Sequence, residues 1–567
     1  MIPSAHAHRS IEVLESRIAP AAMTFTVTSL ADTNTAGTLR FELAAADAHA
    51  GPDKIVFHLP APPVHGENVI TLTAPLASTG DVTITGPGAG KLQINGAGLY
   101  QGFVFTKPAG VTDSPVTISG LSIVHTTGAI SAQQSLTLKN VVVSGNSSST
   151  VGAGISVNSL ATDATVSISG SFIAGNKSTG FAGINILGAA GDLKSVTISK
   201  TDVTGNTDTT GKGGGLYAQV SGTGAAISVT SSQFTGNTAS YGGGLYLSDL
   251  NSAATSKITI SSSTVSANES VGNSIPGGGG IMIFKGNATI SKSTIDNNSA
   301  VFNGGGIMAS PGFNSLTITD TSVTGNQTTN TNSSGQGGGG LFIEGADLTT
   351  LQDATITGSH FLDNSTVRSG GGLFVTNGIN LSVTGSSFVS NRAAGNGGGA
   401  YASNNSGANV NVTISGSSFA GNIGNGAINT SGTGAGVFDL ISSKVSGTVG
   451  TGVNAETTGA VLLKTDTITD NLGGGYAGGV NITSSKLVTI TGGSITDNFA
   501  NRGGGLFLYH TTSSVEGVTI SGNAALGDGG GVLVFDSDAT LQIAKITANS
   551  AASSPDVSNV ASAITFV

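Results

Sequence analysis

The residues best placed to bind a metal ion are Asp470 and Asp497, which end the matching phrases TITD and SITD. If these phrases lie on neighbouring turns of a repeat structure, their carboxylates would be about 5 Å apart. Oxygen ligands at that separation suit a divalent cation such as Ca²⁺. Two solvated turn residues would produce the same pattern. We therefore predict no metal site and keep these two carboxylates as the only candidates.

Side chains for acid–base catalysis are sparse. After Arg40 the only arginines are Arg368, Arg392 and Arg502, each in a loop, and Asn206-Thr-Asp208 is a lone Asn-x-Asp phrase. A polysaccharide lyase needs several Asp to hold Ca²⁺ and an Arg or Lys base, and a hydrolase needs paired carboxylates. The chain contains no Asp-Asp, Gly-His-Gly or Arg-x-Lys sequence. We predict no catalytic residue and no cofactor.

The elements that must position these residues come from an internal repeat. Residues 234–247, FTGNTASYGGGLYL, join an apolar-x-x-Asn phrase, a short loop, a Gly triplet and an alternating strand. The phrase recurs at a spacing of mostly 25 to 31 residues, and each repeat holds three short strands. Its asparagines are Asn146, Asn176, Asn206, Asn237, Asn268, Asn298, Asn326, Asn364, Asn391, Asn422, Asn471, Asn498, Asn523 and Asn549.

Three strands per repeat predict an all-β chain folded as a right-handed parallel β-helix, with one repeat per turn and roughly 17 turns. Inward Val, Ile, Leu and Phe would fill its core, including the aromatic side chains of Phe234, Phe361, Phe388 and Phe419. We assign the Asn residues a structural role. Asn tolerates a positive φ at a bend, and stacked Asn side chains can hydrogen-bond along the axis.

The sequence pattern also predicts where the segments of the chain begin and end. Residues 1–22 form a leader or flexible tail, and residues 23–66 form an N-terminal cap of strand, helix and strand, with the helix within 38–48. Residues 67–550 form the β-helix, and residues 551–567 form a tail or partial cap. Within the β-helix, residues 424–465 lack the regular phrase and would form degenerate turns.

Composition excludes several classes of function. The net charge is −10 without a basic stripe, which argues against a nucleic-acid partner. No run of about 18 apolar residues occurs, so we expect no membrane-spanning helix. Cys and Trp are absent, which removes disulfides, thiolate metal sites and the strongest aromatic platform for sugars.

Three motifs resemble those of known families. The phrase FTGN with a following Gly-Gly-Leu resembles the polymorphic outer-membrane protein repeat, which pairs Phe-x-x-Asn with Gly-Gly-Ala-Ile. Gly37-Thr-Leu-Arg40 resembles the Ser-Leu-Arg motif of the N-terminal cap of bacterial β-helix surface proteins. Leu14-Glu-Ser-Arg17 resembles a Leu-Glu-x-Arg leader of bacterial surface and exported proteins. These resemblances imply an extracellular or cell-surface location, associated with the outer membrane, and a role in adhesion.

We therefore expect a non-enzymatic β-helix that acts as an adhesin or as a structural component of an envelope, matrix or filament. Its partners would be a host or matrix surface, or other copies of itself packed laterally or end to end, because a free strand edge recruits strands. The alternatives are a carbohydrate-active enzyme, either a lyase or a hydrolase, and a glycan-binding module. A specific function should lie where the repeated phrase is broken, namely near 327–336, at 424–465 and at the two ends.

Overall fold

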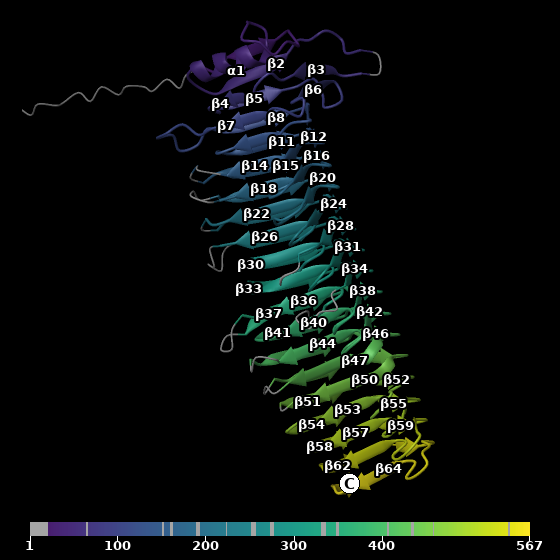
Figure 1. The fold of residues 1–567 in the computed structure, drawn as a ribbon. Helices are drawn as coiled ribbons and strands as arrows, with labels where there is room; N and C mark the ends of the chain where they lie inside the picture. Colours follow the sequence, from purple (N-terminus) through teal and green to yellow (C-terminus); the bar gives the residue numbers. More distant parts are fainter. Residues whose placement is uncertain are drawn as a thin grey trace, which may run out of the picture.

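The chain winds into a right-handed parallel β-helix of about 18 turns, with three strands in a typical turn (Figure 1). The computed structural model describes residues 21–566 apart from 64–65, 150–151, 159–160, 162, 189–192, 223, 251–256, 273–276, 330–335, 347–350, 405–407, 433–435, 458 and 543–544. Most of the predicted leader, and most of the loop at 327–336, lie outside these residues. Across the described part, no helix is long and apolar enough to cross a membrane.

One turn shows how the strands are arranged. β26 (Leu245–Asp249), β27 (Lys257–Ser261) and β28 (Thr264–Ser266) each pair in parallel with the matching strands of the turns before and after. We call the column of strands containing β26 the Gly-led column, because a Gly triplet precedes most of its members. Later members are β30 (Ile281–Ser291), β33 (Ile307–Thr319), β36 (Leu341–Glu344), β40 (Leu373–Thr376), β44 (Ala400–Asn404), β47 (Ile423–Gly432), β50 (Val449–Glu456), β53 (Val480–Thr483), β57 (Leu506–Tyr509) and β61 (Val532–Phe535).

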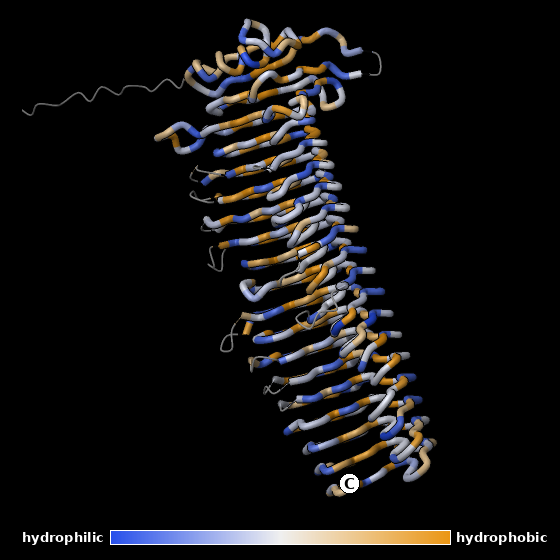
Figure 2. Tube along the Cα trace, viewed as in Figure 1, coloured by the Kyte–Doolittle hydropathy of each residue, from blue (hydrophilic) through white to orange (hydrophobic). Residues whose placement is uncertain are grey.

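The core runs the length of the β-helix. Hydrophobic and hydrophilic residues alternate along the strands in Figure 2, and one continuous cluster of buried Val, Ile, Leu and Phe fills the interior. Phe361, Phe388 and Phe419 are fully buried and stack in parallel with ring centroids 4.7 and 4.6 Å apart. Phe234 is also fully buried, so the prediction of interior aromatic residues is confirmed.

The repeated asparagines form a buried hydrogen-bond ladder along the axis. Asn268 is representative: its Oδ1 accepts from the backbone N–H and the Nδ2 of Asn237, at 2.9 and 3.0 Å. Its own Nδ2 donates to Oδ1 of Asn298 at 2.9 Å and to the carbonyl of Phe234 at 2.8 Å. All donors and acceptors of the amide are thus satisfied inside the protein, which lets a polar group be buried at little cost.

The prediction that the asparagines adopt a positive φ at the bend is wrong. The residue that adopts a positive φ is the one before each ladder Asn, for example Gly236 at 64° and Ala267 at 52°. The ladder asparagines do not have positive φ, so their conformational tolerance is not the reason for their presence. Their role is the hydrogen-bond ladder.

A second ladder of Ser and Thr lies at another bend. From Thr201 to Ser417, the backbone N–H of each residue in this ladder donates to the hydroxyl of the residue one turn later, as Ser232 does to Ser263 at 3.2 Å. The run ends at Asp466, whose Oδ1 accepts from the N–H of Ser443 and whose Oδ2 accepts from the N–H of Lys464, both at 2.8 Å. Burial raises the pKa of Asp466 to about 7, against the lowering effect of these two donors.

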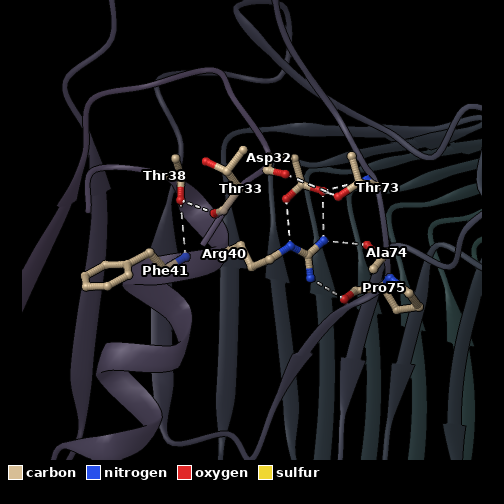
Figure 3. Close-up of polar contacts among 8 residues, drawn as sticks. All are labelled: Asp32, Thr33, Thr38, Arg40, Phe41, Thr73, Ala74 and Pro75. Atoms are coloured by element: carbon tan, nitrogen blue, oxygen red, sulfur yellow. Dashed lines mark hydrogen bonds and ion pairs between the residues drawn. The ribbon is translucent and has the colours of Figure 1, made fainter. Parts of the chain in front are cut away.

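The N-terminal end carries the helix of the fold. β1 (Thr24–Val27), α1 (Leu39–Ala48) and β2 (Asp53–Phe57) form this region, and β2 pairs with β5 (Val82–Thr85) of the β-helix. Arg40 on α1 holds Asp32 through two hydrogen bonds of 3.0 and 2.8 Å and also donates to the carbonyls of Ala74 and Pro75 (Figure 3). Arg40 therefore ties the helix to the first turns.

At the other end, residues assigned to a tail or partial cap carry two further strands. β64 (Val557–Val560) pairs with β61, and β65 (Ala563–Phe566) pairs with β62 (Asp538–Gln542). The β-helical pairing therefore continues past residue 550.

Candidate ligand-binding groove

A second apolar column lies on the outer side of the Gly-led strands. Its side chains point away from the core but are buried, because the loop after each ladder Asn folds back over them; they are Tyr217, Tyr246, Met282, Met308, Phe342, Phe374 and Tyr401. The first Gly of the triplet makes this possible. Gly370 has a φ of 70°, and a Cβ there would lie 2.5 Å from Cβ of Phe374. The predicted core of inward Val, Ile, Leu and Phe did not include this outer apolar layer.

The covering loop is missing from two of the degenerate turns. β47 and β50 run straight through the corner where other turns have a two-residue strand, a loop and a Gly triplet. The turns are also short: 23 residues separate Thr448 from Asn471, against 31 between Asn206 and Asn237. The loop that covers the outer face elsewhere is therefore absent at these two turns, although Asn429 on β47 is still only 2% exposed.

A groove of about 690 Å³ occupies this gap. It crosses four consecutive turns, and its lining residues are Gly424, Asn425, Val449, Gly450, Thr451, Asn454, Leu472, Gly473, Gly474, Gly475, Tyr476, Asn481, Phe499 and Asn501. Val449 and Leu472 are about half exposed, at 53% and 51%. None of these described lining residues is an Asp, Glu, His, Lys or Arg. The groove thus offers amides, glycines, apolar surface, the hydroxyl of Thr451 and the phenol of Tyr476 as contacts for a ligand.

The polar floor lies in the column that is apolar from Tyr217 to Tyr401 and polar at Ser156 and Asn185 before it. Tyr401 is followed in register by Asn429, Asn454 and Asn481, and then by Phe507. Nδ2 of Asn481 donates to Oδ1 of Asn454 at 2.6 Å. Oδ1 of Asn429 and Oδ1 of Asn481 are buried without a hydrogen-bond partner among the described residues. Oδ1 of Asn185, earlier in the same column, is also buried without a partner among the described residues, so this feature is not specific to the groove.

An aromatic side chain stands at the end of the groove. Tyr476 is 51% exposed, and its ring lies on that of Phe507 with centroids 4.8 Å apart and an interplanar angle of 21°. The guanidinium of Arg502 is 6.0 Å from the centre of the Tyr476 ring and pairs with Asp528 at 2.8 Å. Phe507 packs against the Tyr476 ring, and about half of the surface of Tyr476 remains exposed to solvent.

A second, more polar cleft lies on the last turns. It has a volume of about 420 Å³, and its lining includes Lys486, His510, Asp536 and Asp538. Nε2 of His510 and Oδ2 of Asp536 are 2.6 Å apart, and both side chains are about half exposed. Tyr509 stacks on the imidazole with centroids 3.8 Å apart. This cleft brings together a cation, an imidazole and two carboxylates, which the sequence analysis did not anticipate because they come from separate repeats.

The predicted candidate carboxylates have a visible structural role. Asp470 and Asp497 are the bend residues before Asn471 and Asn498, with φ of 57° and 54°, and both are exposed. Oδ2 of Asp470 accepts from the hydroxyl of Thr469 at 3.0 Å. Among the described residues there is no group of three His, Cys, Asp or Glu side chains arranged to hold a metal ion. Asp470 and Asp497 stay candidates only, and the prediction remains that the chain holds no metal site.

Arg392 and Arg502 lie on separate turns and do not converge on one site. Arg392 lies on the two-residue strand β43 (Arg392–Ala393) and is exposed, whereas Arg502 is paired with Asp528. The hydroxyl of Ser553 also contacts Asp528. All fourteen predicted structural Asn positions, in contrast, belong to the buried ladder, with Thr448 standing between Asn422 and Asn471.

Comparison with known proteins identifies no family. No protein-family model matches the chain, and no curated protein matches it. The resemblance to the polymorphic outer-membrane protein repeat is therefore not supported by a family match. Among solved structures, the chain is similar to a family 6 polysaccharide lyase, an alginate lyase, with 10% identity over 96% of this chain and 100% of that chain, and a TM-score of 0.20. Similarity at this level supports no conclusion about the function of this chain.

Proposed function

We propose that this chain is a non-enzymatic β-helical rod, secreted or displayed at the cell surface, that acts by binding, in an adhesin-like or structural role. The observation that carries the proposal is the groove over residues 424–501. It opens where the repeat loses its covering loop, and its lining is made of amides, glycines and apolar side chains. Such a lining favours recognition over proton transfer.

The rest of the rod supports the same proposal. The Asn and Ser ladders repeat one set of contacts along most of the chain, which suits a rigid scaffold that holds one distinctive region at a defined place. Self-association of rods, laterally or end to end, belongs to this proposal. Electron microscopy over a concentration series checks it, since single rods at every concentration would count against a filament or matrix role.

Binding and catalysis can be separated in one assay. The purified chain is incubated with pelletable cell-envelope and matrix polysaccharide, and both the bound protein and the released products are measured. The proposal expects saturable binding and no new chain ends in the polymer. Absence of binding, or product release proportional to protein concentration, would contradict it.

A carbohydrate-active enzyme is the second candidate, favoured by the cleft with Lys486, His510 and Asp536. An imidazole paired with a carboxylate is suited to general acid–base chemistry. If this candidate is right, polymer cleavage should be measurable and should be lost in Asp536→Asn without a loss of folding. If cleavage is absent, or persists in Asp536→Asn, this candidate fails.

A further inference from the structure

We propose that the groove over residues 424–501 binds a short, uncharged oligosaccharide. This inference rests on the proposed function, because it names the ligand class of the same site. It combines four observations: a supported aromatic ring, a row of amides, an uncharged lining and unfilled space beside two glycines.

The aromatic ring provides a flat apolar surface. Tyr476 is backed by Phe507 and remains 51% exposed, so the ring is held in place before a ligand arrives. The C–H face of a pyranose is apolar while its edge carries hydroxyls, and such a face can lie flat on a tyrosine ring. A pre-positioned ring loses little conformational entropy on binding.

The amide row provides hydrogen bonds at a regular spacing. Asn454 and Asn481 are adjacent in register, which places their Cα atoms one turn, or about 4.8 Å, apart. Nδ2 of Asn481 is used by Asn454, and Nδ2 of Asn454 has no protein partner among the described residues. The Asn454 amide therefore keeps its N–H donors for a ligand hydroxyl, while Oδ1 of Asn481 is buried.

The charge of the lining selects among ligands. The described lining residues carry no ionised side chain at neutral pH, and the nearby Arg502 is already paired with Asp528 at 2.8 Å. An acidic saccharide would have no free cation to meet its carboxylate, whereas an uncharged one gives up less hydration on entering. The groove therefore favours neutral sugars over uronates.

The glycines leave room for the ligand. A Cβ at Gly474 or at Gly475 would meet nothing within 4 Å, and neither residue has a φ that excludes other amino acids. These two glycines are thus not required by the backbone. The groove crosses four turns, or about 14 Å along the axis, which suits two to three sugar residues.

The test is isothermal titration calorimetry of the full chain with neutral tetrasaccharides of several linkages, including cellotetraose and chitotetraose, and with tetragalacturonate as the acidic counterpart. We expect at least one neutral tetrasaccharide to bind at least tenfold more tightly than tetragalacturonate. Binding by none of the neutral sugars, or preference for the acidic one, would overturn the inference.

Variants locate the binding. Tyr476→Ala and Gly475→Leu should each weaken binding at least tenfold, the first by removing the ring and the second by filling the groove. Tyr476→Phe should bind within about threefold of the wild type, and Leu487→Ala, at a residue 55% exposed outside the groove, should bind unchanged. Unaltered binding by both Tyr476→Ala and Gly475→Leu would overturn the proposed site.

The same variants separate this inference from the proposed function. If the rod binds envelope or matrix material but Tyr476→Ala and Gly475→Leu bind it equally well, the proposed function stands and the groove is not the site. If the wild type binds no such material, the proposed function fails irrespective of the titrations with short sugars.

Discussion

Asn454 and Asn481 face each other across neighbouring strands at a position that holds Tyr401 earlier in the same column and Phe507 later in it. A hydrogen bond of 2.6 Å joins the two amides. From Tyr217 to Tyr401 this column is apolar and covered, whereas Ser156 and Asn185 make it polar in earlier turns that keep the loop. A polar residue in this column therefore does not by itself mark the groove. The groove is distinguished by the missing loop at β47 and β50 and by the half-exposed ring of Tyr476.

The Asn ladder should be a major source of stability. Replacing Asn298 by Ala removes a side chain that accepts from Asn268 and donates to Asn326. Buried groups of neighbouring turns would lose their partners, at about 1–3 kcal/mol each, so we expect a loss of at least about 3 kcal/mol. Denaturant unfolding measures it. Gln327→Ala, at an exposed neighbouring position, should change stability by less than about 0.5 kcal/mol, and an equal effect of both variants would refute the assignment.

Repairing the ladder should stabilise the chain. Thr448 donates its backbone N–H to Oδ1 of Asn471 at 3.1 Å, but its buried hydroxyl has no partner among the described residues. Thr448→Asn would join Asn422 to Asn471 and should raise the free energy of unfolding by about 1 kcal/mol. Thr448→Val removes the hydroxyl without joining the ladder, and should raise it less. Equal gains in thermal unfolding experiments would show that the ladder bond adds nothing.

Asp466 should make stability depend on pH. Its pKa is raised to about 7 in the folded chain, against 3.8 for the ordinary carboxyl. The unfolded chain therefore releases this proton at lower pH than the folded one, and stability should fall as pH rises from about 4 to 7. Asp466→Ser, which continues the Ser ladder, should remove that component. Chemical unfolding at pH 4.5 and 7.5 measures the difference, and an unchanged pH dependence in Asp466→Ser would contradict the assignment.

Arg40 should hold the N-terminal helix in place. Burial raises the pKa of Asp32, but the bonds from Arg40 and Thr73 outweigh it and lower the pKa below its usual value. This contribution is present above the unfolded pKa near 4 and is lost as pH falls through the folded pKa. Arg40→Lys keeps the charge but cannot make all four bonds, so we expect a loss of about 2 kcal/mol and faster hydrogen exchange in β1 and α1. Exposed Lys54→Ala should leave exchange unchanged, and unaltered exchange in Arg40→Lys would refute this role.

Much of the fold follows from local pattern. The period-2 strands, the spacing of the Asn phrase and the buried Phe361 and Phe388 all depend on neighbours along the chain or one repeat away. The spacing therefore predicted about 17 turns, close to the 18 observed. The helix at Leu39–Ala48 was predicted for the same reason.

The groove depends on which loops cover the outer face of the strands, and the periodicity of the sequence does not predict this coverage. Tyr246 alternates with the inward Leu245 and Leu247, which places it on the outer face of its strand, yet it is only 2% exposed and packs in a buried cluster. The short spacing around Thr448 and the row of Asn429, Asn454 and Asn481 were the available signals. The degenerate turns were predicted from the sequence. The sequence does not show that a loop covers the outer face of the other turns, so it could not predict that the absence of this loop leaves a groove.

The most direct test of the central claim is a crystal structure of the chain with the tightest-binding neutral tetrasaccharide. We predict one sugar ring lying on Tyr476, with a hydroxyl in hydrogen-bond contact with Nδ2 of Asn454, and no altered bond in the sugar. A saccharide found instead in the cleft of Lys486, His510 and Asp536, or cleaved in the crystal, would contradict the account and favour the enzyme.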